Sequence, residues 1–246
     1  MKKLVKAMAN RVLASRGLAI GPMNDDQAAG NKQYIDATAT VAAAQREGLS
    51  VCDYVEKLWN QQGDTDRVIE KLRACGIFEG SRPSILEIGP GTGRYLERVL
   101  QQCKPTRYEC YEIATDWARW LSTKYPVITL DTDGVSLKQT PNDSIDLLHA
   151  HGVFVCLPFL SAWAYWKEMW RVVKADGWIA FDLYTEGCME EDTVEKWLAS
   201  SHSYPSFFPK AYVVSQFEAH GFSLNHSFYN RHGQGRSEYL VFRKKA

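Results

Sequence analysis

The sequence lacks the features of several classes of protein. Its 246 residues carry 29 Lys and Arg against 29 Asp and Glu, so the formal net charge is zero. Basic and aromatic residues are not interleaved along any face, and we therefore expect no nucleic-acid partner. The six cysteines show no paired spacing, which favours reduced thiols in a cytoplasmic protein without zinc or another metal site. No apolar run is long enough to cross a membrane.

The most informative segment is an apolar strand at 84–88 that runs into three alternating glycines, Gly89, Gly91 and Gly93. Glycine permits a sharp turn and the close approach of a ligand to the main chain. A helix follows at 95–103, and its first amides would point at that ligand. A dinucleotide-binding turn needs a small residue three positions after Gly91, where this chain has Arg94. NAD is therefore disfavoured.

With Glu87 before the glycines, this segment resembles the first motif of the class I S-adenosylmethionine-dependent methyltransferases. The resemblance implies S-adenosylmethionine as cofactor and S-adenosylhomocysteine as product. It implies that the glycine turn holds the methionine end and the ribose, and that Glu87 reaches the methionine ammonium group. It also implies a Rossmann-like, doubly wound α/β fold, with seven strands, mostly parallel, a C-terminal antiparallel hairpin and an N-terminal helical extension. A tight strand-to-helix turn in another α/β protein is the alternative.

Two acids follow on the next strands. A strand at 107–112 ends in Glu112, roughly 20 residues beyond the glycine turn, where an acid can accept hydrogen bonds from both ribose hydroxyls. Glu109 is the competitor, but it lies inside the strand. A third strand at 127–130 leads to Asp133 and Gly134. The resemblance implies that Asp133 meets the adenine amino group and that Gly134 allows close approach, with Asp131 as the alternative.

The fourth strand, at 144–152, carries His149 and His151. Ligands of open α/β sheets bind at the carboxyl ends of the strands, and the resemblance implies that His151 lies where the family's substrate-facing residue emerges. An imidazole with a pKa near neutrality suits a general base for a hydroxyl group. His149 shares the same face of the strand and is the second candidate, as an orienting residue. A structural histidine is the alternative, and a histidine here argues against the magnesium site of catechol-type relatives.

The remaining segments suggest where the acceptor binds. Tyr184 and Glu186 lie at the tip of a fifth strand, and Tyr204 and Phe207 lie on an aromatic loop, so all four are candidate substrate contacts. A hydrophobic plug is the alternative for the loop. We expect a helical extension or cap at 1–80 and a methyltransferase domain at 81–246 with a lid-like insertion near 187–210. Strands at 222–229 and 237–242 would form the final hairpin.

Residues 1–21 contain five basic and no acidic residues, with apolar residues along one helical face. Such a basic amphipathic helix can lie on an anionic membrane surface. The alternatives are an organellar presequence in a eukaryotic source, or a helix that packs on its own domain or on a second subunit of a homodimer. The protein is therefore expected in the cytoplasm, free or peripheral at the membrane.

The sequence thus favours an S-adenosylmethionine-dependent methyltransferase that methylates oxygen, with a sugar, glycan or other polar small molecule as acceptor. A natural-product or quinone-like acceptor is the second interpretation. A non-catalytic regulatory protein that binds S-adenosylmethionine is a third, opposed by the complete glycine motif and by His151. A nicotinamide-dependent oxidoreductase is a fourth, opposed by Arg94.

Overall fold

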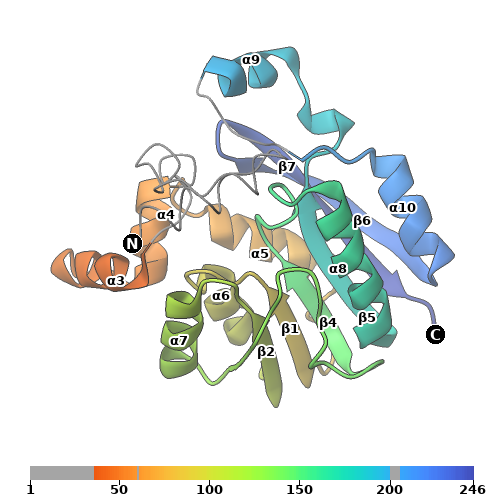
Figure 1. Cartoon of the computed structure of the whole chain (residues 1–246), viewed down its shortest axis with the longest axis horizontal. Coiled ribbons are helices and arrows are strands. Elements are labelled where there is room, and N and C mark those ends of the chain that lie inside the picture. The colour runs from red at the N-terminus through yellow and green to blue at the C-terminus, as the bar shows by residue number, and fades with distance from the viewer. Residues whose placement is uncertain (1–35, 60, 200–205) are drawn as a thin grey trace, which may run out of the picture. The chain divides into compact units, whose positions relative to one another are not determined.

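The computed structural model describes residues 36–59, 61–199 and 206–246 (Figure 1). Its strands are β1 (Ser84–Ile88), β2 (Arg107–Tyr111), β3 (Ile128–Leu130), β4 (Ile145–Ala150), β5 (Val173–Leu183), β6 (Phe222–His232) and β7 (Gly235–Lys244). Its helices are α3 (Ala37–Arg46), α4 (Val51–Trp59), α5 (Asp64–Ala74), α6 (Arg94–Gln102), α7 (Thr115–Lys124), α8 (Phe159–Val172), the 3-10 turn η1 (Glu186–Cys188), α9 (Glu191–Ala199) and α10 (Lys210–Ala219). Residues 1–21, with the basic segment, lie outside this description.

The strands form one seven-stranded sheet in the order β3-β2-β1-β4-β5-β7-β6. Strands β1 to β5 run parallel to one another, whereas β7 runs antiparallel to both β5 and β6. The expected fold class is confirmed, including the C-terminal hairpin. From the centre of the sheet the chain leaves β1 toward β2 and later returns to β4 on its other side. In sheets with such a reversal, ligands bind at the carboxyl ends of the strands on either side of it, which here are β1 and β4.

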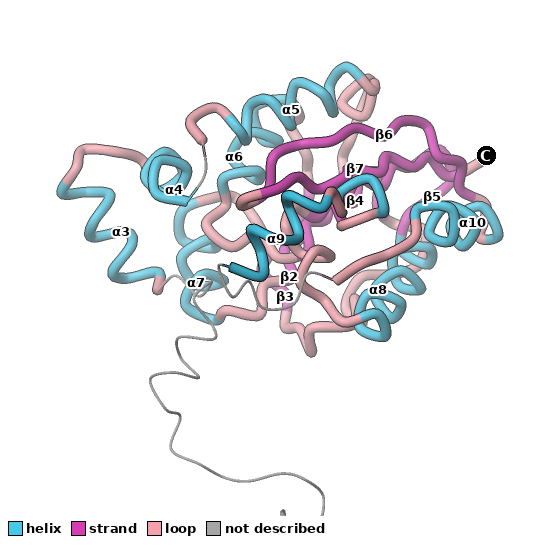
Figure 2. Tube along the Cα trace, turned by 90° about the horizontal axis from the view of Figure 1, so that it is seen from above, coloured by secondary structure: helices cyan, strands magenta, loops and turns pink. Residues whose placement is uncertain are grey.

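Alternate residues of the buried strands pack into two separate cores. Ile85 of β1 contacts the core beneath α5 and α6, while Leu86 and Ile88 contact the core beneath α8 and α10. This follows from the two-residue period of a strand, which sends successive side chains to opposite faces. Figure 2 shows the sheet between α5 and α6 on one side and α8 and α10 on the other.

Two local features shape the elements near the site. The Ser50 hydroxyl accepts a hydrogen bond from the Asp53 amide at 3.1 Å and so caps the start of α4. Strand β5 begins at Val173 and kinks within its length, where Asp176 has a φ of 60°. A side chain on Gly177 would come within 2.8 Å of the Lys174 carbonyl oxygen.

Of the helices in the described part of the chain, none has the length and apolar character needed to span a membrane. The segment expected as a helical extension is helical where it is described, over α3, α4 and α5. Its proposed contact with a membrane or a second subunit depends on residues 1–21 and stays a prediction.

Candidate active site

The turn after β1 leaves an open position at its centre. Gly89, Gly91 and Gly93 all have positive φ, at 63°, 52° and 76°. A side chain on Gly89 would come within 2.7 Å of Val153, so this glycine is required by the loop that follows β4. A side chain on Gly91 would meet no atom within 4 Å. The space in front of Gly91 is therefore free for a ligand, and α6 begins immediately behind it without a side-chain cap.

Glu112 lies across from this turn, as its spacing predicted. One carboxylate oxygen accepts a hydrogen bond from the Gly91 amide at 2.7 Å, and the other accepts one from the Ala114 amide at 2.8 Å. The side chain is 9% exposed, and burial raises its pKa. Glu109, the competitor, is instead occupied by Arg107, at 2.5 Å, and by the Thr140 hydroxyl. The geometry thus favours Glu112 over Glu109 as the acid that faces a ligand in the turn.

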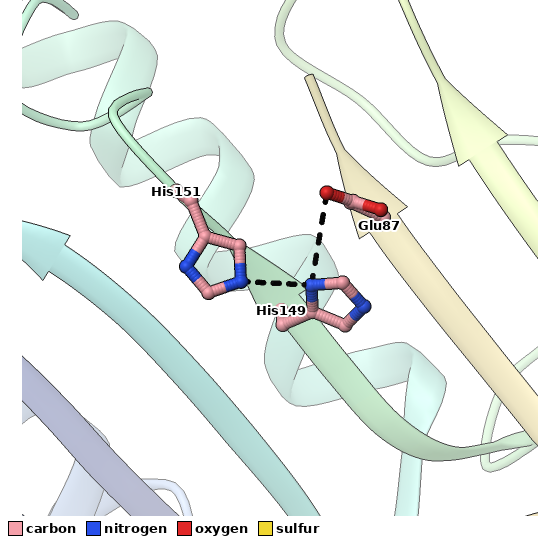
Figure 3. Close-up of side chains that lie close together, drawn as sticks. All are labelled: Glu87, His149 and His151. Atoms are coloured by element: carbon pink, nitrogen blue, oxygen red, sulfur yellow. Dashed lines mark hydrogen bonds and ion pairs between the residues drawn. The ribbon is translucent and has the colours of Figure 1, made fainter. Parts of the chain in front are cut away.

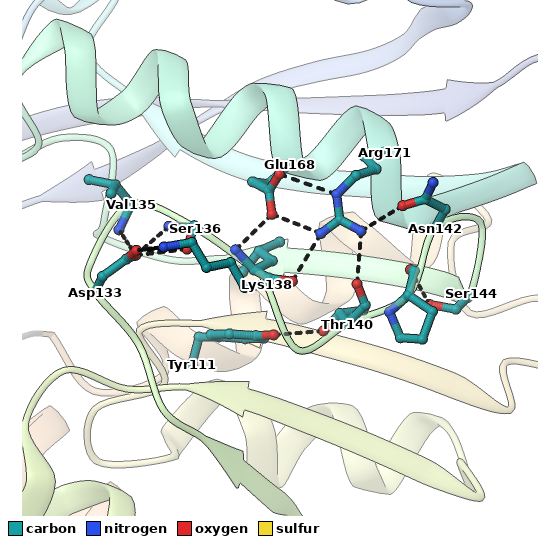
Figure 4. A network of polar contacts seen from close by, with 12 residues as sticks. Tyr111, Asp133, Val135, Ser136, Lys138, Thr140, Asn142, Ser144, Glu168 and Arg171 are labelled. Carbon is teal, nitrogen blue, oxygen red and sulfur yellow. Dashed lines mark hydrogen bonds and ion pairs between the residues drawn. The ribbon is translucent and has the colours of Figure 1, made fainter.

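Asp133 is placed differently from the expected adenine contact. It is exposed, accepts hydrogen bonds from the backbone amides of Val135 and Ser136 at 3.1 and 2.8 Å, and pairs with Lys138 at 2.8 Å (Figure 4). These hydrogen bonds, that of Lys138 foremost, lower the pKa of Asp133. Its carboxylate therefore stabilises its own turn, and the role of Asp133 in binding adenine stays a prediction.

The loop that contains Asp133 is tied to α8. Arg171 donates to the backbone carbonyls of Leu137 and Thr140 and pairs with Glu168 at 2.8 Å (Figure 4). A side chain on Gly134 would come within 3.2 Å of Ile113, which is 71% exposed and directly follows Glu112. Sequence analysis missed Ile113. Its signal was an apolar residue directly after the acid at a strand end, where the side chain can contact the face of a flat ligand.

Glu87, His149 and His151 lie together in the interior, from two neighbouring strands (Figure 3). Glu87 is paired in register with His149, and both are 1% exposed. The Nδ1 atom of His149 lies 3.1 Å from Nε2 of His151 and 3.9 Å from the Glu87 carboxylate. The structure therefore brings together the predicted base, its predicted orienting partner and the acid of the glycine motif.

Three tyrosines extend this group. The Tyr108 hydroxyl donates to Glu87 at 2.7 Å and lies 2.8 Å from Nε2 of His149. The Tyr239 hydroxyl lies 3.0 Å from Nδ1 of His151 and 3.4 Å from the Tyr95 hydroxyl. The ring of Tyr95 stacks on His151 with centroids 3.7 Å apart. None of these tyrosines was singled out from the sequence, because their roles depend on strand register and on a strand near the C-terminus.

Burial controls the ionisation of this group. It raises the pKa of Glu87 to about 8, with a further increase from Glu112 and an opposing effect of the Tyr108 hydrogen bond. It lowers the pKa of His149 to about 3. Burial, followed by His149 and Arg94, lowers the pKa of His151 well below 6.5. The expectation that His151 titrates near neutral pH is therefore wrong: its ring is already neutral there.

The donor atoms of Glu87, His149 and His151 all lie within 4.8 Å of one another. Two imidazoles and a carboxylate are of the kinds that bind transition metals. Here, however, the facing nitrogens are at hydrogen-bond distance, and each of the three side chains also contacts a tyrosine hydroxyl. We therefore interpret the group as a hydrogen-bonded chain.

Of the predicted acceptor contacts in the described part of the chain, Tyr184 and Phe207 are adjacent, whereas Glu186 bonds to the start of α10. Tyr184 is buried, with its hydroxyl 2.7 Å from Nδ1 of His232. Glu186 is exposed and accepts a hydrogen bond at 2.9 Å from the Lys210 amide, which caps α10. Phe207 is 48% exposed and forms a bridge with the backbone of Tyr184. Tyr204 lies outside the described residues. Tyr184 and Glu186 thus have structural partners, and the lid stays a prediction.

Comparison with known proteins agrees with this geometry. Residues 86–181 match a family model described as a methyltransferase domain. No curated protein matches the sequence. Magnesium protoporphyrin IX methyltransferase from Synechocystis PCC 6803, solved with bound S-adenosylhomocysteine, has a similar structure, with 13% identity, a TM-score of 0.56 and 100% of both chains covered.

Two further structures are similar. An S-adenosylmethionine-dependent methyltransferase from Mesorhizobium loti has 14% identity and a TM-score of 0.55, with 71% of this chain and 96% of that chain covered. An O-methyltransferase family protein from Burkholderia thailandensis has 15% identity and a TM-score of 0.57, with 79% of this chain and 58% of that chain covered. At these identities the structures show a shared fold. The family match identifies a methyltransferase domain over residues 86–181, and the glycine turn and the shared fold support a class I enzyme whose cofactor is S-adenosylmethionine.

Proposed function

We propose that this methyltransferase transfers the methyl group to a hydroxyl oxygen of a polar small molecule, with a sugar or glycan hydroxyl as the first candidate. The observation that carries the proposal is the position of His151, at the carboxyl end of β4. Two residues further on, Val153 packs against Gly89 of the turn. The amide of the intervening Gly152 is fixed by Asp182 at 2.6 Å. The imidazole is therefore held beside the turn that binds the cofactor.

The residues of the turn suit the cofactor. The open space at Gly91 would admit its methionine and ribose portions, and the Glu112 carboxylate would accept the ribose hydroxyls. Glu87 is 1% exposed and is hydrogen-bonded to Tyr108, and its contact with the methionine ammonium group stays a prediction. When bound, S-adenosylmethionine supplies a methyl group on a positively charged sulfur, which a nucleophile attacks in line.

A hydroxyl acceptor loses its proton as the new carbon–oxygen bond forms, and a positioned base accelerates such a step about 10²- to 10⁴-fold. His151 is neutral at pH 7 because burial lowers its pKa, so one ring nitrogen carries a free electron pair. We assign Nδ1 as that atom in the state in which Glu87 is ionised. It faces the Tyr239 hydroxyl at 3.0 Å, which must turn aside or pass the proton on.

A quinone-like acceptor is the second candidate. Ile113 and Phe207 are large apolar side chains that are 71% and 48% exposed. Such surfaces would suit a flat apolar acceptor.

The proposal is tested by incubating the purified protein with methyl-labelled S-adenosylmethionine and separate sets of nucleotide sugars, monosaccharides and quinols. We expect a labelled methyl ether on one hydroxyl class, detected by mass spectrometry and lost in His151→Ala. Label on nitrogen, or undiminished turnover in the variant, would contradict oxygen methylation with His151 as base.

A further inference from the structure

A buried chain of hydrogen bonds joins five side chains in this order: Glu87, Tyr108, His149, His151 and Tyr239. The direction in which these hydrogen bonds are donated follows from counting the hydrogens. A tyrosine hydroxyl has one hydrogen, and a neutral imidazole carries a hydrogen on only one of its nitrogens. The donor in one hydrogen bond therefore determines the donor in the next hydrogen bond of the chain. The distances between neighbours, 2.7, 2.8, 3.1 and 3.0 Å, all permit hydrogen bonds.

With Glu87 ionised, its carboxylate can only accept, so the Tyr108 hydroxyl donates to it across the 2.7 Å contact. The Tyr108 oxygen then accepts from Nε2–H of His149, whose Nδ1 accepts from Nε2–H of His151. This leaves Nδ1 of His151 with a free electron pair toward the Tyr239 hydroxyl.

With Glu87 protonated, every bond reverses. The carboxyl group donates to Tyr108, whose hydroxyl donates to Nε2 of His149. Nδ1–H of His149 then donates to Nε2 of His151, and Nδ1–H of His151 donates to the Tyr239 oxygen. The Tyr239 hydroxyl can then donate to Tyr95 at 3.4 Å. In this state Nδ1 of His151 is not basic.

We propose that Glu87, Tyr108 and His149 form a proton relay that selects the basic nitrogen of His151 and receives, at Glu87, the proton that His151 removes from the acceptor. The delivery of the acceptor proton to Glu87 rests on the proposed function. The selection of the basic nitrogen of His151 does not. In the transfer, Nδ1 of His151 gains the acceptor proton and Nε2 gives its own to His149. His149 passes its Nε2 proton to Tyr108, and Tyr108 passes its hydroxyl proton to Glu87. Only Glu87 ends with one proton more.

The ionisation of the groups in this hydrogen-bonded chain agrees with transfer of the proton toward Glu87. The two imidazoles resist a positive charge, while Glu87 holds a proton up to a pKa of about 8. The proton therefore comes to rest on the carboxylate. The titratable or charged groups that face the chain are Glu112 toward Glu87, Arg94 and Tyr95 toward His151, Cys110 and Cys103 toward Tyr108, and Asp182 toward Tyr239.

A direct electrostatic effect of Glu87 on His149, without the relay, predicts the opposite tautomer of His149. An ionised carboxylate acting alone across 3.9 Å would favour a hydrogen on Nδ1 of His149, the nearer nitrogen. The relay instead places that hydrogen on Nε2, because 3.9 Å is too long for a hydrogen bond and Tyr108 intervenes. The tautomer of His149 at high pH therefore distinguishes the relay from the direct electrostatic effect.

The experiment follows the ring nitrogens by ¹⁵N NMR in the protein without acceptor or cofactor. His149 and His151 are assigned by the loss of signals in His149→Ala and His151→Ala. Between about pH 6 and about pH 10, both rings should change from the Nδ1–H to the Nε2–H form, with a midpoint near the Glu87 pKa of about 8 and without becoming charged.

Glu87→Gln should make both tautomers independent of pH, and Tyr108→Phe should uncouple them from Glu87. The matched control is Tyr111→Phe, another buried tyrosine of β2 whose hydroxyl contacts Thr140 on the opposite face. Tyr111→Phe should keep the pH-dependent change of tautomer in both imidazoles. Unchanged tautomers while the Glu87 carboxyl carbon titrates would overturn the relay, as would Nδ1–H on His149 at high pH. One equivalent of tightly bound metal, whose removal shifts both imidazoles, would also overturn it.

The delivery of the acceptor proton to Glu87 is tested by activity measurements once an acceptor is found. Tyr108→Phe should lower kcat about 10-fold or more and alter its pH profile, with little change in KM. A normal tautomer change with an unaltered profile would refute proton delivery to Glu87. Failure of oxygen methylation itself would leave the NMR result intact, so the two proposals fail separately.

Discussion

Glu87 should make the protein less stable as the pH rises, and Glu87→Gln should remove that loss. Burial raises the pKa of Glu87 from 4.5 to about 8, so the folded protein holds this proton more tightly than the unfolded chain does. The stabilisation is complete below the unfolded value and is lost as the pH rises through about 8. Each pH unit between the two values corresponds to about 1.4 kcal/mol, which gives up to about 5 kcal/mol of unfolding free energy.

The assay is urea unfolding followed by tryptophan fluorescence, at about pH 6 and about pH 9. The advantage of Glu87→Gln over the wild type should grow between these values by several kcal/mol. The matched control is Glu109→Gln. Glu109 is equally buried, at 1% exposure, but it is compensated by Arg107 at 2.5 Å, so its difference from wild type should stay constant. Parallel pH dependences for wild type and Glu87→Gln would refute the reasoning.

Four further predictions concern binding and turnover. Glu112→Ala should weaken S-adenosylmethionine binding by roughly 1.5 to 3 kcal/mol; calorimetry on the folded variant checks it, and unchanged affinity would exclude the ribose assignment. Gly91→Val should abolish cofactor binding, since its side chain fills open space in front of the turn and strains a φ of 52°; tight binding would show that the ligand lies elsewhere. His151→Ala should keep cofactor affinity and lower kcat about 100-fold. In the wild type, protonation of the His151 ring should limit activity only well below pH 6.5, because its pKa is lowered, whereas ionisation of Glu87 should give a rising limb near pH 8; a limb near pH 7 that Glu87→Gln keeps and His151→Ala removes would contradict the structure. Deletion of residues 1–21 should weaken sedimentation with anionic vesicles at low salt and leave cofactor binding intact; aggregation of the truncated protein would indicate a structural role.

The sequence predicted what depends on local pattern. The glycines, the acid 21 positions after Gly91 in Glu112, and the alternation that puts His149 and His151 on one face are all visible in a single chain. Each reflects backbone geometry, either a positive φ or a two-residue strand period.

What the sequence could not predict depends on register and burial. Glu87 stands opposite His149 because β1 pairs with β4 at that position, and no spacing along the chain specifies this pairing. The pKa of His151 was misjudged for the same reason, because it depends on how deeply neighbouring strands and α6 bury the ring. Asp133 and Glu186 carry local signals typical of ligands, yet they serve a turn and a helix end.

The place of Tyr239 in the chain has a consequence for biosynthesis. It lies on β7, 88 residues after His151, and β7 is inserted between β5 and β6. A nascent chain that has formed β1 to β5 therefore presents β5 as an open sheet edge, ready to pair with another chain. Docking of the final hairpin closes that edge and delivers the Tyr239 hydroxyl in the same event. Until then the polypeptide is both prone to aggregation and without the partner of its histidine, so the enzyme matures only when its last strand is in place.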